Sequence, residues 1–332
     1  MKFSVATLLI LLAIGCGKSG ESAHEVVLYT SVDEPYVTPL VKRFESQTGI
    51  HVRLVTDTEA TKSAALSERI EAEKDHPQAD VYWGNELFHT INLAERGVFA
   101  PYRPRTAEDV PARWRGKADL FTDIGLRARM IAFSTRPEFK GLVGNLHGLN
   151  DLTNPSLKGR VGLCHAGFGT ASGHIAALYV LWGEPKFSEY MRALRANDAH
   201  LLGGNSAVVD QVAAGNLVAG LSDNDDINNA KADGHPVDGV LPDQSPDGDG
   251  TLLIPSTIAL VNRAPHSEDA KKLVDFLCEP SVEKELIAGR FFIASVRDQG
   301  SIKAMDVDYV ETAHQMRHAI ELALNILQDR QK

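Results

Sequence analysis

Short apolar runs alternate with helical patterns along the first hundred residues. The runs are rich in β-branched and aromatic residues, which favour strands, whereas the segments between them repeat apolar residues every three to four positions, as helices do. In chain order we expect a strand at 25–29, a turn and helix at 33–48, a strand at 51–55, a helix at 61–74, a strand at 79–83 and a helix at 87–96. This alternation predicts a parallel sheet covered by helices.

The same alternation returns in the second half of the chain and predicts a second α/β lobe. We expect strands at 160–164, 217–221 and 251–261, and helices at 174–182, 210–214, 267–278, 281–288 and 313–327. Residues 25–125 together with 255–300 are assigned to the first lobe, 126–254 to the second, and 301–332 to a C-terminal helical segment. Ligands of such sheets bind in the loops that follow the carboxyl ends of the strands, so those loops carry the candidate site.

The first sixteen residues have the features of a secretion signal. Lys2 precedes an apolar run at 3–14, which is shorter than the about 20 residues that a membrane-spanning helix needs. The run ends in Ala-Ile-Gly-Cys, which resembles the lipoprotein box of bacterial proteins, and Cys16 would then carry the lipid. Residues 17–24 would form a tether that anchors the protein on the periplasmic or outer side of a bacterial membrane. The alternative is an ordinary cleaved signal in which Cys16 stands by chance.

Composition and charge exclude several classes of protein. The chain has 332 residues, of which 43% are hydrophobic and 23% charged, and this is not the composition of a disordered or collagen-like chain. Its 34 Lys and Arg against 44 Asp and Glu give a net charge of −10 without a basic block, so we expect no nucleic-acid partner. The three cysteines are too few for a disulfide scaffold. Cys164 and Cys278 remain after signal removal, either as a disulfide or as two buried thiols.

Five sequence blocks, in the correct order, resemble one family over most of the chain. They are Leu28-Tyr29-Thr30-Ser31 with 44–50, Ala79-Asp80-Val81 with 93–99, Asp151-Leu152 with 159–161, Asn205-Ser206 to Ala214-Gly215, and 272–277. The family is that of the extracellular solute-binding proteins of ABC importers, in the group that contains ferric-ion-binding proteins. The resemblance implies an α/β chain with the two-lobed periplasmic-binding-protein fold of type II and a ligand cleft between the lobes. It also implies an ABC permease and ATPase as partners, and we expect the protein to be a monomer.

The resemblance places a metal site on loops that face one another across the cleft. In ferric-binding relatives two adjacent tyrosines follow the strand after the Asn-Ser block, and here Asp225 and Asp226 stand in that place. The candidate metal ligands are Asp33, Glu34, Asn85, Glu86, Asp225 and Asp226. Carboxylate and amide oxygens suit hard cations, and several carboxylates in one cleft need a positive partner such as a metal ion or an ammonium group. The alternative for each residue is a helix cap or a solvated loop end.

A second group of residues suits an anion. Thr61, Thr170, Ser172 and Gly173 lie at the starts of predicted helices, where free N–H groups bind phosphate or carboxylate. In ferric-binding relatives the corresponding Ser-Gly turn and an asparagine hold a synergistic anion, and Thr170, Ser172, Gly173 and Asn205 match those positions. The alternative is that each hydroxyl caps its own helix.

Together these features predict a binding protein that catalyses no reaction and has no cofactor. It would capture ferric iron or another hard cation, with a synergistic anion, by closing its lobes. It would then pass this cargo to a membrane permease. Three alternatives stay open. They are a binder of an aminoalkylphosphonate or a sugar phosphate, which nearby relatives transport, a metal-assisted hydrolase on the same scaffold, and a sensor domain that passes its closed state to a membrane partner. The hydrolase is disfavoured because the sequence offers no nucleophile constellation.

Overall fold

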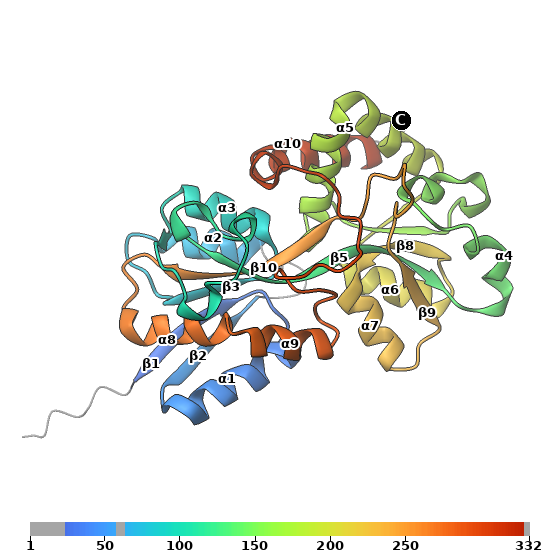
Figure 1. The fold of residues 1–332 in the computed structure, drawn as a ribbon. Coiled ribbons are helices and arrows are strands. Elements are labelled where there is room, and N and C mark those ends of the chain that lie inside the picture. Colours follow the sequence, from blue (N-terminus) through green and yellow to red (C-terminus); the bar gives the residue numbers. More distant parts are fainter. Residues whose placement is uncertain (1–23, 58–63, 329–332) are drawn as a thin grey trace, which may run out of the picture.

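The computed structural model describes residues 24–57 and 64–328 and consists of two α/β lobes side by side (Figure 1). The first lobe contains β1 (Glu25–Thr30), α1 (Glu34–Thr48), β2 (His51–Thr56), α2 (Ala64–Ala72), β3 (Val81–Gly84), α3 (Leu87–Glu95), β4 (Phe99–Ala100), α8 (Ser267–Leu277) and α9 (Pro280–Ala288). The second lobe contains α4 (Lys140–Val143), β6 (Val161–Cys164), α5 (Gly169–Ala196), β7 (His200–Leu202), α6 (Asn205–Ala214), β8 (Ala219–Asp223), α7 (Asn224–Ala232) and β9 (Val237–Val240). The strands β5 (Thr122–Ser134) and β10 (Leu253–Val261) run between the lobes.

In the described part of the chain the strands form one sheet in the order β2-β1-β3-β10-β5-β8-β6-β7, with β4 added on β10 and β9 on β5. β1 pairs in parallel with β2 and β3, and β6 pairs in parallel with β7 and β8. β5 and β10 pair with each other in antiparallel orientation. β5 is also antiparallel to β8, and β10 to β3. The segments that follow β3 and β8 therefore meet between the lobes, where Arg127 of β5 contacts both Asn85 and Asp223.

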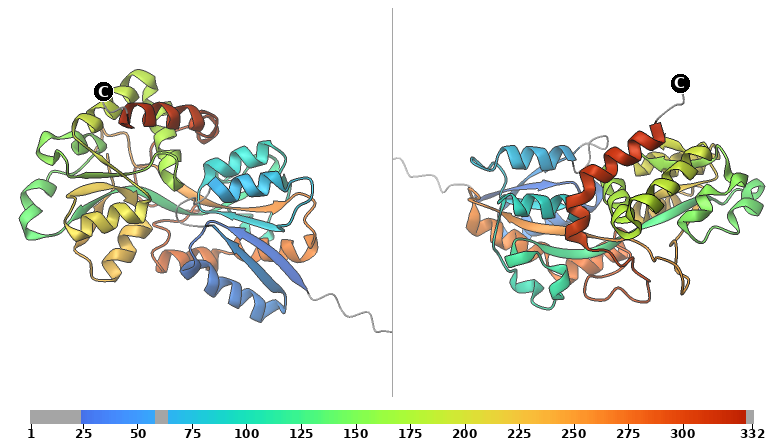
Figure 2. Two further views of the ribbon diagram at one scale, coloured as in Figure 1. Left: turned by 180° about the vertical axis from the view of Figure 1, so that it is seen from behind. Right: turned by 90° about the horizontal axis from the view of Figure 1, so that it is seen from above.

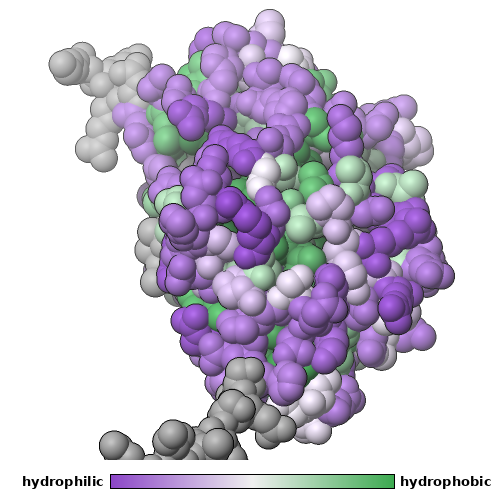
Figure 3. All heavy atoms as spheres, turned by 90° about the vertical axis from the view of Figure 1, so that its left-hand side faces the viewer, coloured by the Kyte–Doolittle hydropathy of each residue, from purple (hydrophilic) through white to green (hydrophobic). Residues whose placement is uncertain are grey.

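The first lobe forms as its apolar pattern predicts. Val27 and Leu28 of β1 are buried because helices cover both faces of the sheet. Helix α1 buries Leu40 and Phe44 on one face and ends at Gly49, whose φ of 71° is the left-handed conformation that glycine favours. Hydrophilic residues predominate on the outer face of this lobe, and hydrophobic residues show between them in small groups (Figure 3).

Among the elements that differ from the prediction, three contribute to the candidate site. The apolar pattern does not predict β5, because its buried positions include charged residues such as Arg127 and Arg129. Helix α5 is longer than predicted and continues through a break at Gly183 (φ 71°). The helix α7 is absent from the prediction, and Asp225 and Asp226 lie in its first turn rather than in a loop.

The helix α10 (Tyr309–Gln328) lies along the seam between the lobes, as the view from above in Figure 2 makes clear. Its buried Met316 and Ala319 belong to one apolar cluster with Leu93 of α3 and Leu178 of α5, so the cores of the two lobes are continuous beneath it. Among the described residues, no helix combines the length and apolar character that crossing a membrane requires. Cys164 and Cys278 are both buried, and no disulfide joins them.

The carboxyl group of Asp123, on β5, is 1% exposed and its Oδ1 has no hydrogen-bond partner in the described structure. Burial raises the pKa of this group well above its ordinary value, so stability falls as the pH rises above about 4. We expect Asp123→Asn to raise the free energy of unfolding at pH 7.5 by at least about 1 kcal/mol, since one pKa unit corresponds to about 1.4 kcal/mol. Urea unfolding at pH 7.5 and pH 5 tests this, and the gain should shrink at pH 5. A variant that is less stable than the parent at both pH values would contradict it.

Candidate functional site

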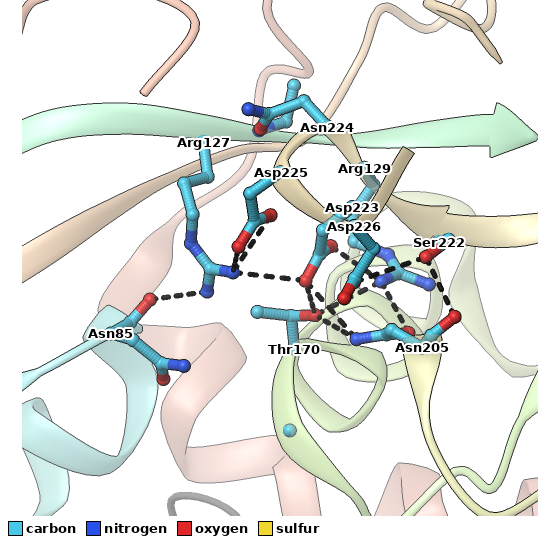
Figure 4. A network of polar contacts seen from close by, with 12 residues as sticks. Asn85, Arg127, Arg129, Thr170, Asn205, Ser222, Asp223, Asn224, Asp225 and Asp226 are labelled. Carbon is cyan, nitrogen blue, oxygen red and sulfur yellow. Dashed lines mark hydrogen bonds and ion pairs between the residues drawn. The ribbon is translucent and has the colours of Figure 1, made fainter. Parts of the chain in front are cut away.

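Two arginines of β5 form the centre of a buried network of charges (Figure 4). Arg127 and Arg129 lie two residues apart on the strand and therefore point to the same side of the sheet, and they are 2% and 1% exposed. Nη1 of Arg129 lies 2.6 Å from Oδ1 of Asp223. Nη1 of Arg127 donates to Oδ2 of Asp223 and Oδ2 of Asp225, each at 3.2 Å. Two carboxylates of the second lobe thus have guanidinium partners within the chain.

The carboxylate of Asp223 accepts hydrogen bonds from four side chains, those of Arg127, Arg129, Thr170 and Asn205. Oγ1 of Thr170 donates to Oδ2 of Asp223 at 2.5 Å, and Nδ2 of Asn205 donates to the same oxygen at 3.2 Å. Burial raises the pKa of Asp223, but the positive charges of Arg129 and Arg127 outweigh burial and leave the pKa below its ordinary value. Asp223 therefore stays ionised at the end of β8.

Burial by itself lowers the pKa of the Arg127 guanidinium, but the charges of Asp225 and Asp223 outweigh it and raise the pKa. Arg127 is consequently a permanent positive charge. Its second nitrogen, Nη2, donates to the carbonyl oxygen of Asn85 in the first lobe at 2.6 Å. The guanidinium also lies over the ring of Phe291, 5.5 Å from the ring centre. One side chain thus contacts the loop after β3 and the carboxylates after β8.

A small cavity of about 20 Å³ opens beside this network, which is room for one ion or one water molecule. Three helices of the second lobe begin at its wall, namely α5 at Gly169, α6 at Asn205 and α7 at Asn224. Helix N-termini carry free N–H groups and a partial positive charge. The wall also includes the carboxylates of Asp225 and Asp226. The cavity therefore presents anion-binding and cation-binding groups together.

The carboxylates of Asp223, Asp225 and Asp226 each offer an oxygen within 4.8 Å of the others. Oxygens that bind one hard cation at about 2.0–2.6 Å lie at most about 5 Å apart, so this spacing is compatible with a shared ion. Asp226 is half-buried, and its Oδ2 accepts a hydrogen bond from Ser222 at 3.3 Å. Four other side chains already hold the carboxylate of Asp223. The carboxylates of Asp225 and Asp226 are therefore better placed to bind a ligand.

The other predicted metal ligands lie on the first lobe and have different surroundings. Asn85 lines the cavity, and its Oδ1 accepts from the hydroxyl of Ser31. Glu86 is buried and caps α3, with its carboxylate accepting from the backbone of Phe88 and His89. Asp33 is the half-buried N-cap residue of α1, and Glu34 is exposed in the first turn of that helix. The capping alternative therefore describes Glu86, whereas Asn85, Asp225 and Asp226 come together at the cavity.

The predicted anion-binding residues also divide into two groups. Thr170 and Asn205 lie together at the cavity, but the carboxylate that they contact is that of Asp223. Ser172 donates to the carbonyl oxygen of Gly169 within its own helix. Gly173 faces Phe88 of the first lobe so closely that a Cβ atom there would lie 2.2 Å from the ring. Thr61 and Cys16 lie outside the described residues.

The residues that sequence reasoning missed are Arg127, Arg129 and Asp223. The signal for the arginines is the Arg-Ala-Arg sequence inside an otherwise apolar segment, 124–133, where a solvent-facing pair is not expected. Their presence changes the electrostatic interpretation of the acidic loops, because the chain itself supplies positive charges for the carboxylates.

The two lobes contact each other at the rim of the site. The hydroxyl of Tyr36 in α1 donates to Oδ1 of Asn229 in α7 at 2.7 Å, and its ring packs on Phe291 with the ring centres 4.6 Å apart. Burial, together with the charges of Asp225 and Asp33, raises the pKa of Tyr36 to about 12. Tyr36 is thus an uncharged phenol that links the lobes.

The model of a protein family described as bacterial extracellular solute-binding proteins matches residues 26–287. The chain belongs to this family. The predicted resemblance and the predicted two-lobed fold class are both confirmed. This solute-binding protein superposes on the apo ferric ion-binding protein A of Pasteurella haemolytica with a TM-score of 0.80 and 20% identity, over 93% of this chain and 100% of the other.

Two further relatives point to different ligands. The periplasmic binding protein AfuA of Actinobacillus pleuropneumoniae, solved with fructose 6-phosphate, has a TM-score of 0.79 and 21% identity, over 92% of this chain and 99% of the other. Iron uptake protein A1 of Synechocystis sp. is 27% identical over 285 residues, which are 79% of this chain and 75% of the relative. The relatives thus agree on solute binding and divide between iron and a sugar phosphate.

Proposed function

We propose that this protein is the solute-binding component of an ABC importer, anchored through Cys16 outside a bacterial membrane. Its solute is a hard cation, with ferric iron as the first candidate, bound together with a small anion. Binding closes the lobes, and the closed form delivers the cation to the permease. No reaction takes place on the protein. The observation that carries this proposal is the group of carboxylates at a cavity of ionic size between the lobes.

The charges around the cavity favour a cation over an uncharged solute. The carboxylates whose charges act on Arg127 are those of Asp33, Asp223, Asp225 and Asp226. The wall of the cavity carries three of these carboxylates, those of Asp223, Asp225 and Asp226, beside one guanidinium, that of Arg127. Carboxylates this close together repel one another, and a multivalent cation bound among them lowers that repulsion.

A small anion has its own place beside the cation. The first turns of α5 and α6 border the cavity, and their N–H groups suit a carboxylate, carbonate or phosphate oxygen. The anion would also lower the total charge that a trivalent cation brings into the site.

The second candidate is a sugar phosphate or an aminoalkylphosphonate. It is favoured by the same pairing of helix N-termini with carboxylates, since the phosphate would bind the former and hydroxyl or ammonium groups the latter. It is disfavoured by the cavity of about 20 Å³, because an organic phosphate needs the lobes further apart.

A thermal-shift screen of the chain from Ser19 onward separates these candidates. The probes are Fe³⁺ with citrate, divalent metals, fructose 6-phosphate and 2-aminoethylphosphonate. A ligand at 100 times its Kd stabilises by about 2.7 kcal/mol. We expect a shift with a metal that disappears in Asp225→Ala/Asp226→Ala and persists in Glu184→Ala/Glu189→Ala, which removes two exposed carboxylates from α5. A shift with an organic phosphate alone would favour the second candidate, and hydrolysis of a phosphate ester would favour the enzyme.

A further inference from the structure

We propose that Arg127 is an internal counter-cation that sets the charge of the cations this site selects. The inference rests on the proposed function and adds to it a residue that determines specificity. The guanidinium of Arg127 is already bound to the carboxylate of Asp225, which an entering cation needs as a ligand. The site therefore admits divalent cations, or trivalent cations with an anion, and excludes monovalent ones.

The contacts of Arg127 fix its charge beside the cavity. Its Nη2 donates to the carbonyl of Asn85 at 2.6 Å, and its Nη1 lies 3.2 Å from both Asp223 and Asp225. The ring of Phe291 lies under the guanidinium. The side chain of Arg127 is only 3% exposed, so solvent screens its charge little. Its remaining nitrogen, Nε, is buried without a hydrogen-bond partner among the described residues.

The position of Asp225 makes Arg127 a competitor of the ligand. An ion bound between Asp225 and Asp226 must share the Asp225 carboxylate with Nη1 of Arg127 or displace it. A monovalent metal ion offers no more charge than the guanidinium and donates no hydrogen bonds, so it gains nothing by this exchange. A divalent or trivalent cation attracts the carboxylate more strongly at the same distance.

Removing the charge of Arg127 makes the site more negative by one charge. The preference among cations of similar size should then move toward higher charge. Arg129 does not have the same role, because it contacts Asp223, Thr170 and Asn205 but not Asp225.

The experiment compares Ca²⁺ with Tb³⁺, two hard cations of similar size and different charge, by isothermal titration calorimetry. In Arg127→Gln we expect the ratio of Tb³⁺ to Ca²⁺ affinity to rise at least about tenfold over the parent, which corresponds to about 1.4 kcal/mol. In Arg127→Lys, which keeps the charge, the ratio should stay within about threefold. Arg297→Gln is the matched control, since Arg297 forms a partly buried ion pair with Glu283 away from the cavity.

Should Arg127→Gln fail to fold, the pair Asp223→Asn and Asp223→Asn/Arg127→Gln gives the same comparison, because it removes one buried partner of Arg127 and keeps the carboxylate of Asp225. We again expect the ratio of Tb³⁺ to Ca²⁺ affinity to rise at least about tenfold, here from the single to the double variant. An unchanged ratio in variants that bind both ions would overturn the role of Arg127 while leaving the proposed function intact. Failure of the parent protein to bind either ion would instead count against the proposed function.

Discussion

Replacing Asp223 by alanine is expected to lower the free energy of unfolding at pH 7 by about 3–5 kcal/mol, because it leaves buried charges without their partner. Asp223 is 1% exposed and holds both Arg127 and Arg129 through its two oxygens. It also accepts from Thr170 and Asn205, whose donors would lose an acceptor. Urea unfolding of parent and variant measures the difference.

The control for this prediction is an ion pair in solvent. Glu268 contacts Lys271 at 2.7 Å, but its side chain is 84% exposed. Exposed pairs contribute at most about 1 kcal/mol, so Glu268→Ala should change stability by less than that amount. Equal, small effects of the two substitutions would show that the buried network contributes little to folding.

The second large effect is a loss of stability in acid that depends on His174. This residue of α5 is 2% exposed, and its Nε2 has no hydrogen-bond partner in the described structure. Burial and the nearby charge of Arg129 lower the pKa of His174 to about 3. The unfolded chain therefore binds a proton below pH 6.5 that the folded chain does not, and stability falls as the pH decreases from 6.5 toward 3. Between pH 7 and pH 5 the loss from this group is about 2 kcal/mol.

The substitution His174→Gln isolates this contribution, because glutamine is neutral throughout the range. The parent should lose about 2 kcal/mol more than the variant when urea unfolding is compared at pH 7 and pH 5. The difference between the two proteins is the relevant quantity, since Asp123 acts in the opposite direction and is present in both. Equal losses would mean that His174 is accessible to protons in the folded state.

Much of the fold follows from local patterns along the sequence. The strands β1, β2 and β3 and the helices between them are predicted because their apolar residues repeat with a strand or helix period. The strand β5 escapes this reasoning, since its buried arginines look like surface residues until their carboxylate partners are known. The helix α7 escapes because its first turn, Asn224-Asp225-Asp226, has the composition of a loop.

Part of the candidate site was also predictable from local patterns along the sequence. Asn85, Asp225 and Asp226 follow strands whose carboxyl ends meet, and the structure brings them to one cavity. Glu86 has the same sequence position, but only the structure shows that its carboxylate is used as a cap. The contacts of Asp223 with Thr170 and Asn205 depend on tertiary packing of three helices, which no local pattern specifies.

The central claim is that a hard cation binds between Asp225 and Asp226. Its most direct test is an anomalous difference map from crystals of the chain from Ser19 onward grown with Tb³⁺, whose anomalous signal is strong. We predict a peak within about 2.6 Å of carboxylate oxygens of both residues. A map without a peak at this position, in crystals where Tb³⁺ is bound elsewhere on the chain, would contradict the account.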